Sequence, residues 1–472
     1  MSGRQLLIQA LLAADHLFLV YFLALNASYL VLVVIGYRAT RRSSRETLAS
    51  DLRDMMRSSL VPPVSVIVTA YNEEAGIVES VVSLLRLHQP HYEVVVVNDG
   101  STDGTLPRLI GRFGLRPVTR SFDPSVPCRR IRATYESARF PNLVVVDKEN
   151  GGKGDALNAG INVSRYPLFC AIDGDSVLEE DALLRVVRPF YEHPDSLVAV
   201  GGTVRILNGC AVRAGRIVDV HLPHGLLPRL QVLEYLRAFL FGRMGWSAMN
   251  GLLLISGAFG VFRKQVVVEA GGYATDCVGE DLELLLRVHR MLRDRRRPYR
   301  VSFAPEPVCW TEAPEELGIL GSQRNRWQRG LADSLRRHRR MIGRPRYGVV
   351  GLVALPFYLL FELLGPVVEA LGYLLLLLSG WLGLLEVDFL LALLAAALLY
   401  TAVVSIAALL LDDLAFRRHA GTRELSMLAS AALVEALGYR QLTVWWRLRG
   451  LWGYCQGDRS WGQMVRRGIS SA

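Results

Sequence analysis

Apolar residues are concentrated in a few long runs of the 472-residue chain. Residues 17–36 form an uncharged run of 20 residues, and residues 389–411 form a second of 23. At 1.5 Å per residue, a helix of either length crosses the roughly 30 Å hydrocarbon core of a bilayer. The first run has no small-residue cleavage site after it, so it predicts a retained membrane anchor rather than a signal peptide.

The region 351–385 is a third apolar run, with Glu362 and Glu369 as its only charges. Pro356 and Pro366 interrupt it, so it is either one long kinked span or an interfacial helix that leads into a span. Carboxylates at membrane depth usually face protein or water, which makes both glutamates, with Tyr358 and Tyr373, candidates to line a path through the membrane.

Arginines flank these runs on one side of the predicted membrane. Several follow residue 37, and nine lie within 324–346, so both flanks are predicted to be cytoplasmic. The apolar stretch 425–446 contains Glu435 and precedes further arginines, which predicts a helix at the membrane interface. We therefore divide the chain into an anchor (1–45), a cytoplasmic domain (46–345), transmembrane or interfacial helices (346–446) and a basic, Trp-rich cytoplasmic tail (447–472).

The cytoplasmic domain alternates short strands with helices. Four β-branched or apolar runs, typical of strands buried on both faces, are 64–70, 93–97, 143–146 and 168–172. Helical patterns at 77–87 and 155–163 fall between them, which predicts a doubly wound, mostly parallel α/β sheet that binds ligands beyond the carboxyl ends of its strands. Polar residues stand at those ends: Tyr71-Asn72-Glu73, Asp99 to Asp103, and Asp173-Gly174-Asp175.

Composition narrows the class of protein. The 54 Lys and Arg exceed the 44 Asp and Glu by ten, and 51% of residues are hydrophobic. Six widely spaced cysteines with no C-x-x-C argue against a zinc site or a disulfide framework. The arginine cluster at 324–346 abuts a predicted span, so it indicates contact with lipid headgroups, and no nucleic-acid motif accompanies it. We expect a lipid bilayer, and not a nucleic acid, among the partners.

No amide cradle for phosphate is evident in the predicted sheet. Gly151-Gly152-Lys153 does not continue as a Walker loop, and no G-x-G-x-x-G follows the first strand, which argues against P-loop ATPases and dehydrogenases. A diphosphate would then need a metal ion. Asp173 and Asp175 flank a glycine at the end of an apolar strand, and such carboxylates suit Mg²⁺ or Mn²⁺.

Six motifs occur in the order typical of one enzyme family. They are V-T-A-Y-N-E (68–73), V-N-D-G-S-T-D (97–103), K-E-N-G-G-K-G-D-A-L-N-A-G (148–160), D-G-D-S (173–176), G-E-D (279–281) and Q-R-N-R-W (323–327). With these motifs the chain resembles the family 2 glycosyltransferases of GT-A fold, most of all the poly-β-1,6-N-acetylglucosamine synthases. Chitin-oligosaccharide, hyaluronan and cellulose synthases are neighbouring groups.

The resemblance implies roles for the residues around the donor. Tyr71 and Glu73 would border the uridine, and Asp99 would contact the nucleotide. Asp173 and Asp175 would hold the diphosphate through Mg²⁺ or Mn²⁺, while Lys153, one of only three lysines in this arginine-rich chain, would contact nucleotide or phosphate.

Two helical segments are expected to complete the site. Gln323, Arg326 and Trp327 are spaced to share one helix face, which can offer an amide, a guanidinium and an indole. By resemblance this face lies over the sugar-nucleotide and the acceptor. Glu280 and Asp281 fall in the first turn of a predicted helix, 282–291, where the helix dipole keeps a carboxylate ionised.

The resemblance also assigns the acceptor side of the reaction. Asp281 would be the general base, with inversion from an α-linked donor to a β-linked product, and Ser256 and Gly257 would belong to the acceptor pocket. One departure is Gly279, where the family usually has Thr.

The sequence therefore predicts an inverting polymerase of a UDP-sugar, most readily UDP-GlcNAc, in the inner (plasma) membrane, which threads its polymer into a membrane path. Accessory membrane or export subunits are further expected partners. A hyaluronan-, chitin- or glucan-type synthase, a transferase that adds one sugar to a lipid, and a silent nucleotide-binding scaffold remain alternatives.

Overall fold

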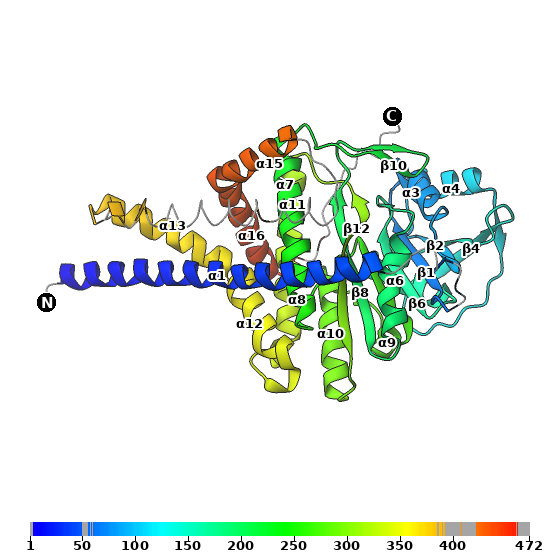
Figure 1. Cartoon of the computed structure of the whole chain (residues 1–472), viewed down its shortest axis with the longest axis horizontal. Coiled ribbons are helices and arrows are strands. Elements are labelled where there is room, and N and C mark those ends of the chain that lie inside the picture. The colour runs from blue at the N-terminus through cyan, green and yellow to red at the C-terminus, as the bar shows by residue number, and fades with distance from the viewer. Residues whose placement is uncertain are drawn as a thin grey trace.

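The computed structural model describes residues 3–49, 55–56, 58, 60–384, 387–388, 390–391, 407, 422–458 and 460. Nearly all of the predicted span 389–411 and the last residues of the predicted tail, Trp461 among them, thus lie outside the described residues. The described residues form an α/β domain from which two helices project (Figure 1).

A mixed ten-stranded sheet forms the centre of the described domain, in the order β3-β4-β5-β2-β1-β6-β11-β8-β12-β7. The four predicted strands are β1, β2, β5 and β6, which lie side by side and run parallel to one another. The other strands were not predicted, and β11 runs antiparallel to β6. The bounds are β1 (Val64–Ala70), β2 (Tyr92–Asn98), β3 (Leu115–Val118), β4 (Ile131–Ser137), β5 (Leu143–Lys148), β6 (Leu168–Asp173), β7 (Val177–Leu178), β8 (Leu197–Ile206), β11 (Phe259–Arg263) and β12 (Arg300–Thr311). A separate hairpin consists of β9 (Ala211–Arg213) and β10 (Arg216–Asp219).

Helices follow the strands as the alternating pattern predicts. The predicted helices are observed as α3 (Ile77–Leu84), α5 (Lys153–Val163) and α10 (Glu280–Asp294). Every residue of β1 is buried, and so are all but the first residue of β2 and all but the last of β6, because helices cover both faces of a parallel sheet. Further helices of this part include α4 (Thr105–Phe113), α6 (Ala182–Glu192), α9 (Lys264–Glu269) and α11 (Leu317–Arg337).

The first predicted span lies within α1 (Gly3–Ala49), a single helix of 47 residues. Residues Ala13–Ser43 of this helix are long and apolar enough to cross a membrane. The helices Val350–Leu363 and Gly365–Trp381 pass the same test only as a pair and are bent by 42° at their junction, which suits a broken span or a re-entrant loop. Both alternatives for 351–385 therefore stay predictions. Figure 1 shows α1 and α13 (Gly365–Trp381) projecting together from one side of the domain.

The bend at Leu364 leaves two carbonyl groups without helical donors. Pro366 has no N–H for the carbonyl of Glu362, and side chains from elsewhere fill the gap. Gln328 Nε2 donates to the carbonyls of Leu363 (3.1 Å) and Glu362 (3.4 Å), and Arg447 also donates to the latter. Side chains of α11 and the C-terminal region thus cap the broken helix.

The two glutamates predicted to avoid lipid are both paired. The Glu362 carboxylate accepts hydrogen bonds from Tyr29 Oη (2.5 Å) and Arg447 Nη2 (3.2 Å). The Glu369 carboxylate accepts two bonds of 2.9 Å from Arg440. Both carboxylates therefore face protein, as expected for charges near apolar helices.

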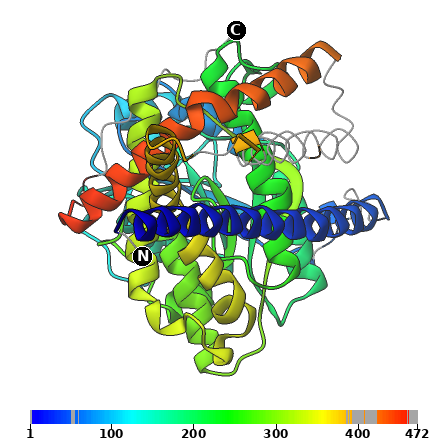
Figure 2. The ribbon, with the colours of Figure 1, turned by 90° about the vertical axis from the view of Figure 1, so that its left-hand side faces the viewer.

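The C-terminal region packs on the α/β domain. Residues 422–455 form α15 (Thr422–Val434), a π-helical turn at 435–439 and α16 (Arg440–Cys455), so the predicted boundary at 446 falls inside α16. α15 contacts α7 (Leu226–Leu236), and α16 contacts α11. Figure 2 shows α15 and α16 in orange to red. A methyl group at Gly450 would lie 2.7 Å from the carbonyl oxygen of Asn325, so α16 approaches α11 closely.

Candidate active site

Two turns at the carboxyl ends of β1 and β2 are hydrogen-bonded to each other. Asn72 adopts a left-handed conformation (φ 56°), and its side-chain oxygen accepts a hydrogen bond from the Thr102 N–H (2.9 Å). Its own N–H donates to Ser101 Oγ (3.0 Å). This arrangement leaves the neighbouring Tyr71 half exposed at the edge of the sheet, with an aromatic face available to a planar ligand.

Glu73 is buried behind Tyr71. Its N–H donates to Thr105 Oγ1 (2.9 Å), and a methyl group at Gly174 would lie 3.3 Å from Glu73 Cγ. The first predicted motif therefore reaches the D-G-D turn after β6, as expected from the adjacent carboxyl ends of parallel strands.

Asp99 is almost fully buried and is occupied by protein donors. Its oxygens accept hydrogen bonds from the N–H groups of Gly151 (3.0 Å) and Gly152 (2.8 Å) and from Lys148 Nζ (2.6 Å). Lys148 Nζ also lies 2.5 Å from the Asp155 carboxylate. The contact of Asp99 with a nucleotide thus stays a prediction, and the structure gives this residue a role in fixing the glycine loop ahead of α5.

Lys148 and Asp155 are site-supporting residues that the sequence reasoning missed. Lys148 is completely buried, and burial of an ammonium is tolerated only when carboxylates compensate its lost hydration. The scarcity of lysine in this chain was the available signal, since it marked Lys148 as much as Lys153.

Lys153 begins α5 and reaches across to β6. Its ammonium forms an ion pair with Asp173 and donates to the carbonyl of Gly257 (3.2 Å). Burial opposes the charge, but the carboxylates of Asp173, Glu280 and Asp281 outweigh burial and raise the pKa of Lys153. The predicted phosphate contact and the predicted metal ligand are therefore direct neighbours.

Asp281 and Gly257 connect the predicted base with the predicted acceptor segment. The Gly257 N–H donates to Asp281 Oδ2 (3.1 Å), and the Leu282 N–H donates to Oδ1 (2.8 Å). A methyl group at Gly257 would lie 2.8 Å from Lys153 Nζ, so a side chain here would push on the lysine. Ser256 stands one residue away, where its carbonyl accepts the N–H of Phe259 in a tight turn.

Glu280 is buried beside this group. Burial raises its pKa to about 7, with Asp281 adding to the rise and Lys153 opposing it. Near neutral pH this carboxyl group consequently carries a proton part of the time, whereas a base must be free of its proton before it can act.

The third predicted group lies on α11. Gln323 and Arg326 are buried, whereas Trp327 is 46% exposed, so part of the indole is accessible to a ligand. The guanidinium carbon of Arg324 lies 4.3 Å above the Trp327 ring, and Arg324 is itself held by Glu234 (2.5 Å). α11 packs against α10, and the charge of Arg326 opposes the rise in the pKa of Glu280 at the start of α10.

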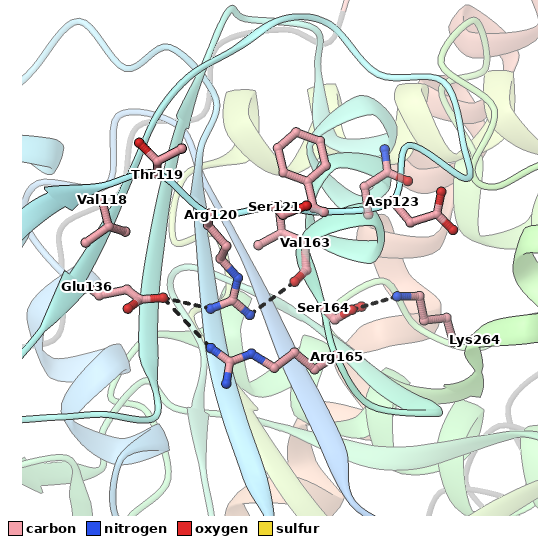
Figure 3. Close-up of a pocket in the computed structure, with 12 residues that line it drawn as sticks. Val118, Thr119, Arg120, Ser121, Asp123, Glu136, Val163, Ser164, Arg165 and Lys264 are labelled. Atoms are coloured by element: carbon pink, nitrogen blue, oxygen red, sulfur yellow. Dashed lines mark hydrogen bonds and ion pairs between the residues drawn. The ribbon is translucent and has the colours of Figure 1, made fainter.

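A separate cavity of about 540 Å³ lies at the amino edge of the sheet, away from these residues. Figure 3 shows Arg120 and Arg165 pointing toward Glu136, and Lys264 toward Ser164. No predicted site residue lines this cavity, and its charged groups bind one another, so the candidate active site is the carboxyl edge.

Comparison with known proteins matches the part of the chain that holds these residues. The family described as "Glycosyl transferase family 2" matches residues 65–109, and "Glycosyltransferase like family 2" matches residues 124–330. This chain carries a family 2 glycosyltransferase domain. The two matches together contain every predicted site residue, from Tyr71 to Trp327.

Curated relatives match the same region. The glycosyltransferase domain is similar to the poly-β-1,6-N-acetyl-D-glucosamine synthase of Staphylococcus epidermidis, with 27% identity over 271 residues, which cover 57% of this chain and 55% of the relative. The synthase of Staphylococcus aureus (strain COL) is 28% identical over 270 residues, which cover 57% and 54%. The match thus spans little more than half of either relative.

A solved structure shares the fold of the glycosyltransferase domain. The mannosyltransferase of Pyrobaculum calidifontis, solved in complex with GDP-Man and Mn²⁺, aligns with a TM-score of 0.51 at 20% identity. The alignment covers 90% of this chain and 99% of that chain. The predicted α/β GT-A fold is therefore confirmed.

Proposed function

We propose that this chain is a membrane-embedded, inverting glycosyltransferase that transfers N-acetylglucosamine from UDP-GlcNAc to a growing β-linked polysaccharide. The observation that carries the proposal is the group at the carboxyl edge: Asp281 bound by the Gly257 N–H, beside the ion pair of Lys153 and Asp173. The named activity of the staphylococcal relatives supports the choice of sugar and polymer.

The donor would bind along the edge that runs from β1 to β6. The exposed ring of Tyr71 can stack on the uracil, and Glu73 lies behind it. Lys153 and Arg326 would contact the diphosphate, whose negative charge compensates two buried cations. On binding, the diphosphate would compete with Asp173 for the Lys153 ammonium.

The carboxylates of the D-G-D turn fit a divalent ion only in part. Among the described residues no group of three or more His, Cys, Asp or Glu is arranged to hold a metal ion. Asp173 and Asp175 supply the hard oxygen ligands that Mg²⁺ and Mn²⁺ prefer, and the diphosphate would have to supply others. Such an ion, when bound, would neutralise charge that develops on the departing UDP.

Asp281 would act on the acceptor. Its carboxylate takes the proton of the acceptor hydroxyl as the hydroxyl oxygen forms a bond with the anomeric carbon. The bond between that carbon and the β-phosphate oxygen breaks, and UDP leaves with the electron pair. Attack from the face opposite UDP turns an α-linked donor into a β-linked product. The Gly257 N–H fixes the carboxylate for this step.

The face of α11 would cover the donor and the end of the polymer. The exposed indole of Trp327 offers a stacking surface for a sugar ring, and Gln323 lies buried four residues before it. Gln323 Oε1 is buried without a hydrogen-bond partner among the described residues, so it is free to accept a bond from a substrate hydroxyl.

The membrane part of the proposal rests on two helical units. α1 is apolar enough to span, and the bent pair 350–381 lies directly after the domain. We propose that these helices hold the enzyme in the inner membrane as a multi-pass protein and that the polymer leaves along them.

Turnover of purified protein tests the proposal. Full-length protein in detergent is incubated with Mn²⁺ or Mg²⁺ and UDP-GlcNAc, UDP-glucose or UDP-glucuronate, and UDP release is measured together with product length and linkage. We expect UDP-GlcNAc to give a β-linked polymer and Asp281→Asn to abolish UDP release while UDP still binds. Preference for another donor would indicate a hyaluronan- or glucan-type synthase, and a single-sugar glycolipid would exclude a polymerase.

A further inference from the structure

Arg243 is a partly buried arginine whose charge interacts with the proposed base. Arg243 ends a π-helical turn, Arg237–Arg243, that interrupts one long helical stretch between α7 and α8 (Met244–Ala248). π-Helical turns occur often at functional sites because the wider turn redirects side chains. Arg237, at the start of the turn, pairs with Glu435 (2.7 Å). Arg243, at its end, has no such carboxylate among the described residues.

The guanidinium of Arg243 is held by an aromatic ring instead. Its central carbon lies 3.7 Å from the centroid of Phe239, and Phe239 in turn contacts Tyr235 at 5.5 Å. Nη1 is shielded from solvent and has no hydrogen-bond partner among the described residues. A buried N–H that finds no acceptor is unfavourable, so a structure that keeps one has a donor available for a ligand.

This helical stretch packs against the apolar helices after the domain, because the ring of Trp246, one turn beyond Arg243, lies 6.3 Å from the ring of Tyr358. Burial lowers the pKa of Arg243 to about 10, while Tyr358, Asp281 and Tyr235 oppose the change. Tyr358 belongs to the bent helices that follow the domain. Asp281 also acts on Lys153, which faces the proposed diphosphate position. The charge of the Asp281 carboxylate thus acts on both cations, Lys153 and Arg243.

We propose that Arg243 binds the acceptor sugar, donating from its guanidinium to a hydroxyl or acetamido oxygen of the residue that Asp281 deprotonates. This inference rests on the proposed function. A neutral sugar oxygen suits a guanidinium that already lies on an aromatic ring, and the rings of Phe239 and Tyr235 add the apolar surface on which sugars pack. Arg243 would thereby determine how the acceptor ring is held and which of its hydroxyl groups meets Asp281.

The test separates acceptor binding from donor binding. We would compare wild type with Arg243→Met, which keeps an unbranched apolar stem, and Arg243→Lys, using UDP-GlcNAc and a β-1,6-linked N-acetylglucosamine pentasaccharide. For Arg243→Met we expect the acceptor KM to rise at least tenfold, with UDP affinity and acceptor-independent hydrolysis of UDP-GlcNAc within twofold of wild type. The acceptor KM of Arg243→Lys should lie between those of wild type and Arg243→Met.

A second arginine provides the control. Arg263 also lies over an aromatic ring, Phe190, at 6.0 Å, but at the end of β11 that adjoins the start of β6, on the opposite edge of the sheet. Arg263→Met should leave the acceptor KM unchanged. An equal loss of UDP affinity in Arg243→Met would overturn the inference in favour of a diphosphate contact. An unchanged acceptor KM would overturn it in favour of a packing role.

The same variants remain informative if the proposed function fails. If wild type forms no product from UDP-GlcNAc, binding of the pentasaccharide is measured directly by tryptophan fluorescence. Binding to wild type that Arg243→Met weakens at least tenfold would support acceptor contact by this residue. Equal binding by both proteins, or by neither, would reject it.

Discussion

Gly279 and Gly330 contact each other through their backbones. A methyl group at Gly279 would lie 2.9 Å from the Cα of Gly330, and one at Gly330 would lie 2.8 Å from the Cα of Gly279. The contact joins the start of α10, which carries Asp281, to α11, which carries Trp327. The Gly279 that departs from the usual Thr of this family is therefore a requirement of the packing in this chain.

Replacing Gly279 by that Thr should consequently harm this protein. The new side chain has only backbone to displace, so we expect α10 and α11 to separate, with a loss of about 1–3 kcal/mol in the free energy of unfolding and at least a tenfold loss in kcat. Thermal unfolding and UDP release measure the two effects. Gly318→Thr, on α11, is the control, because a methyl group at Gly318 meets nothing within 4 Å. Wild-type kcat in Gly279→Thr would contradict the proposed coupling.

Lys148 should be essential for stability rather than for contact with substrate. Lys148→Met leaves the buried carboxylates of Asp99 and Asp155 without their cation, and breaking a buried ion pair typically costs about 3–5 kcal/mol. We expect a large fall in melting temperature or no folded protein. Lys264→Met is the matched control, since Lys264 is only half-buried and donates to the carbonyl of Ser164, and it should unfold near the wild-type temperature. If Lys148→Met and Lys264→Met had the same melting temperature, the loss of the buried ion pairs of Lys148 would not be the cause of the fall.

The sequence alone predicted the four parallel strands at the centre of the sheet. β1, β2, β5 and β6 are continuous apolar runs buried on both faces, so their hydrophobic pattern alone located them, and β1 matches its predicted bounds. β11 and β12 were missed. β11 contains Gly260 and ends in Arg263, and β12 has irregular register around Pro307, so neither reads as a regular strand.

The site was predicted as a set of motifs but not as a set of contacts. Lys153 and Asp173 were assigned to one ligand, and the structure shows that they form an ion pair with each other. No pattern could show that Asp99 is covered by Lys148, or that Arg447 reaches a carbonyl 85 residues earlier in the chain, because such pairs depend on how distant elements pack. The C-terminal helix was read as a separate tail for the same reason.

Stability should fall with rising pH through the titration of Glu280. Burial raises its pKa in the folded protein to about 7, above the ordinary glutamate value of 4.5. The folded state therefore binds more protons than the unfolded state between those values, and stability decreases from about pH 4.5 and levels off above about pH 7. Glu280→Gln removes the ionisation, so its melting temperature should depend less on pH across this interval. Parallel curves for variant and wild type, recorded by scanning fluorimetry in detergent, would refute the assignment.

Gln328 and Arg447 should affect product length more than the first transfer. Gln328 follows Trp327 on α11, and its amide group receives a hydrogen bond from Arg447 (2.8 Å) while it caps the broken helix at Leu363. These contacts join α11, whose Trp327 is proposed to stack on the end of the polymer, to the helices along which the polymer would leave.

We therefore expect Arg447→Met to remove one donor from the Glu362 carbonyl and the only donor of Gln328 Oε1 among the described residues, and so to loosen α11 from those helices. A buried acceptor that loses its donor costs about 1–3 kcal/mol. The rate of UDP release in the first turnover should stay within about threefold of wild type, whereas the mean polymer length should fall several-fold, as measured by gel electrophoresis of labelled product. Arg449→Met, on the same helix but exposed, should give wild-type lengths. Shortened product from Arg449→Met as well would mean that loss of positive charge from α16, and not the contact between Arg447 and Gln328, controls polymer length.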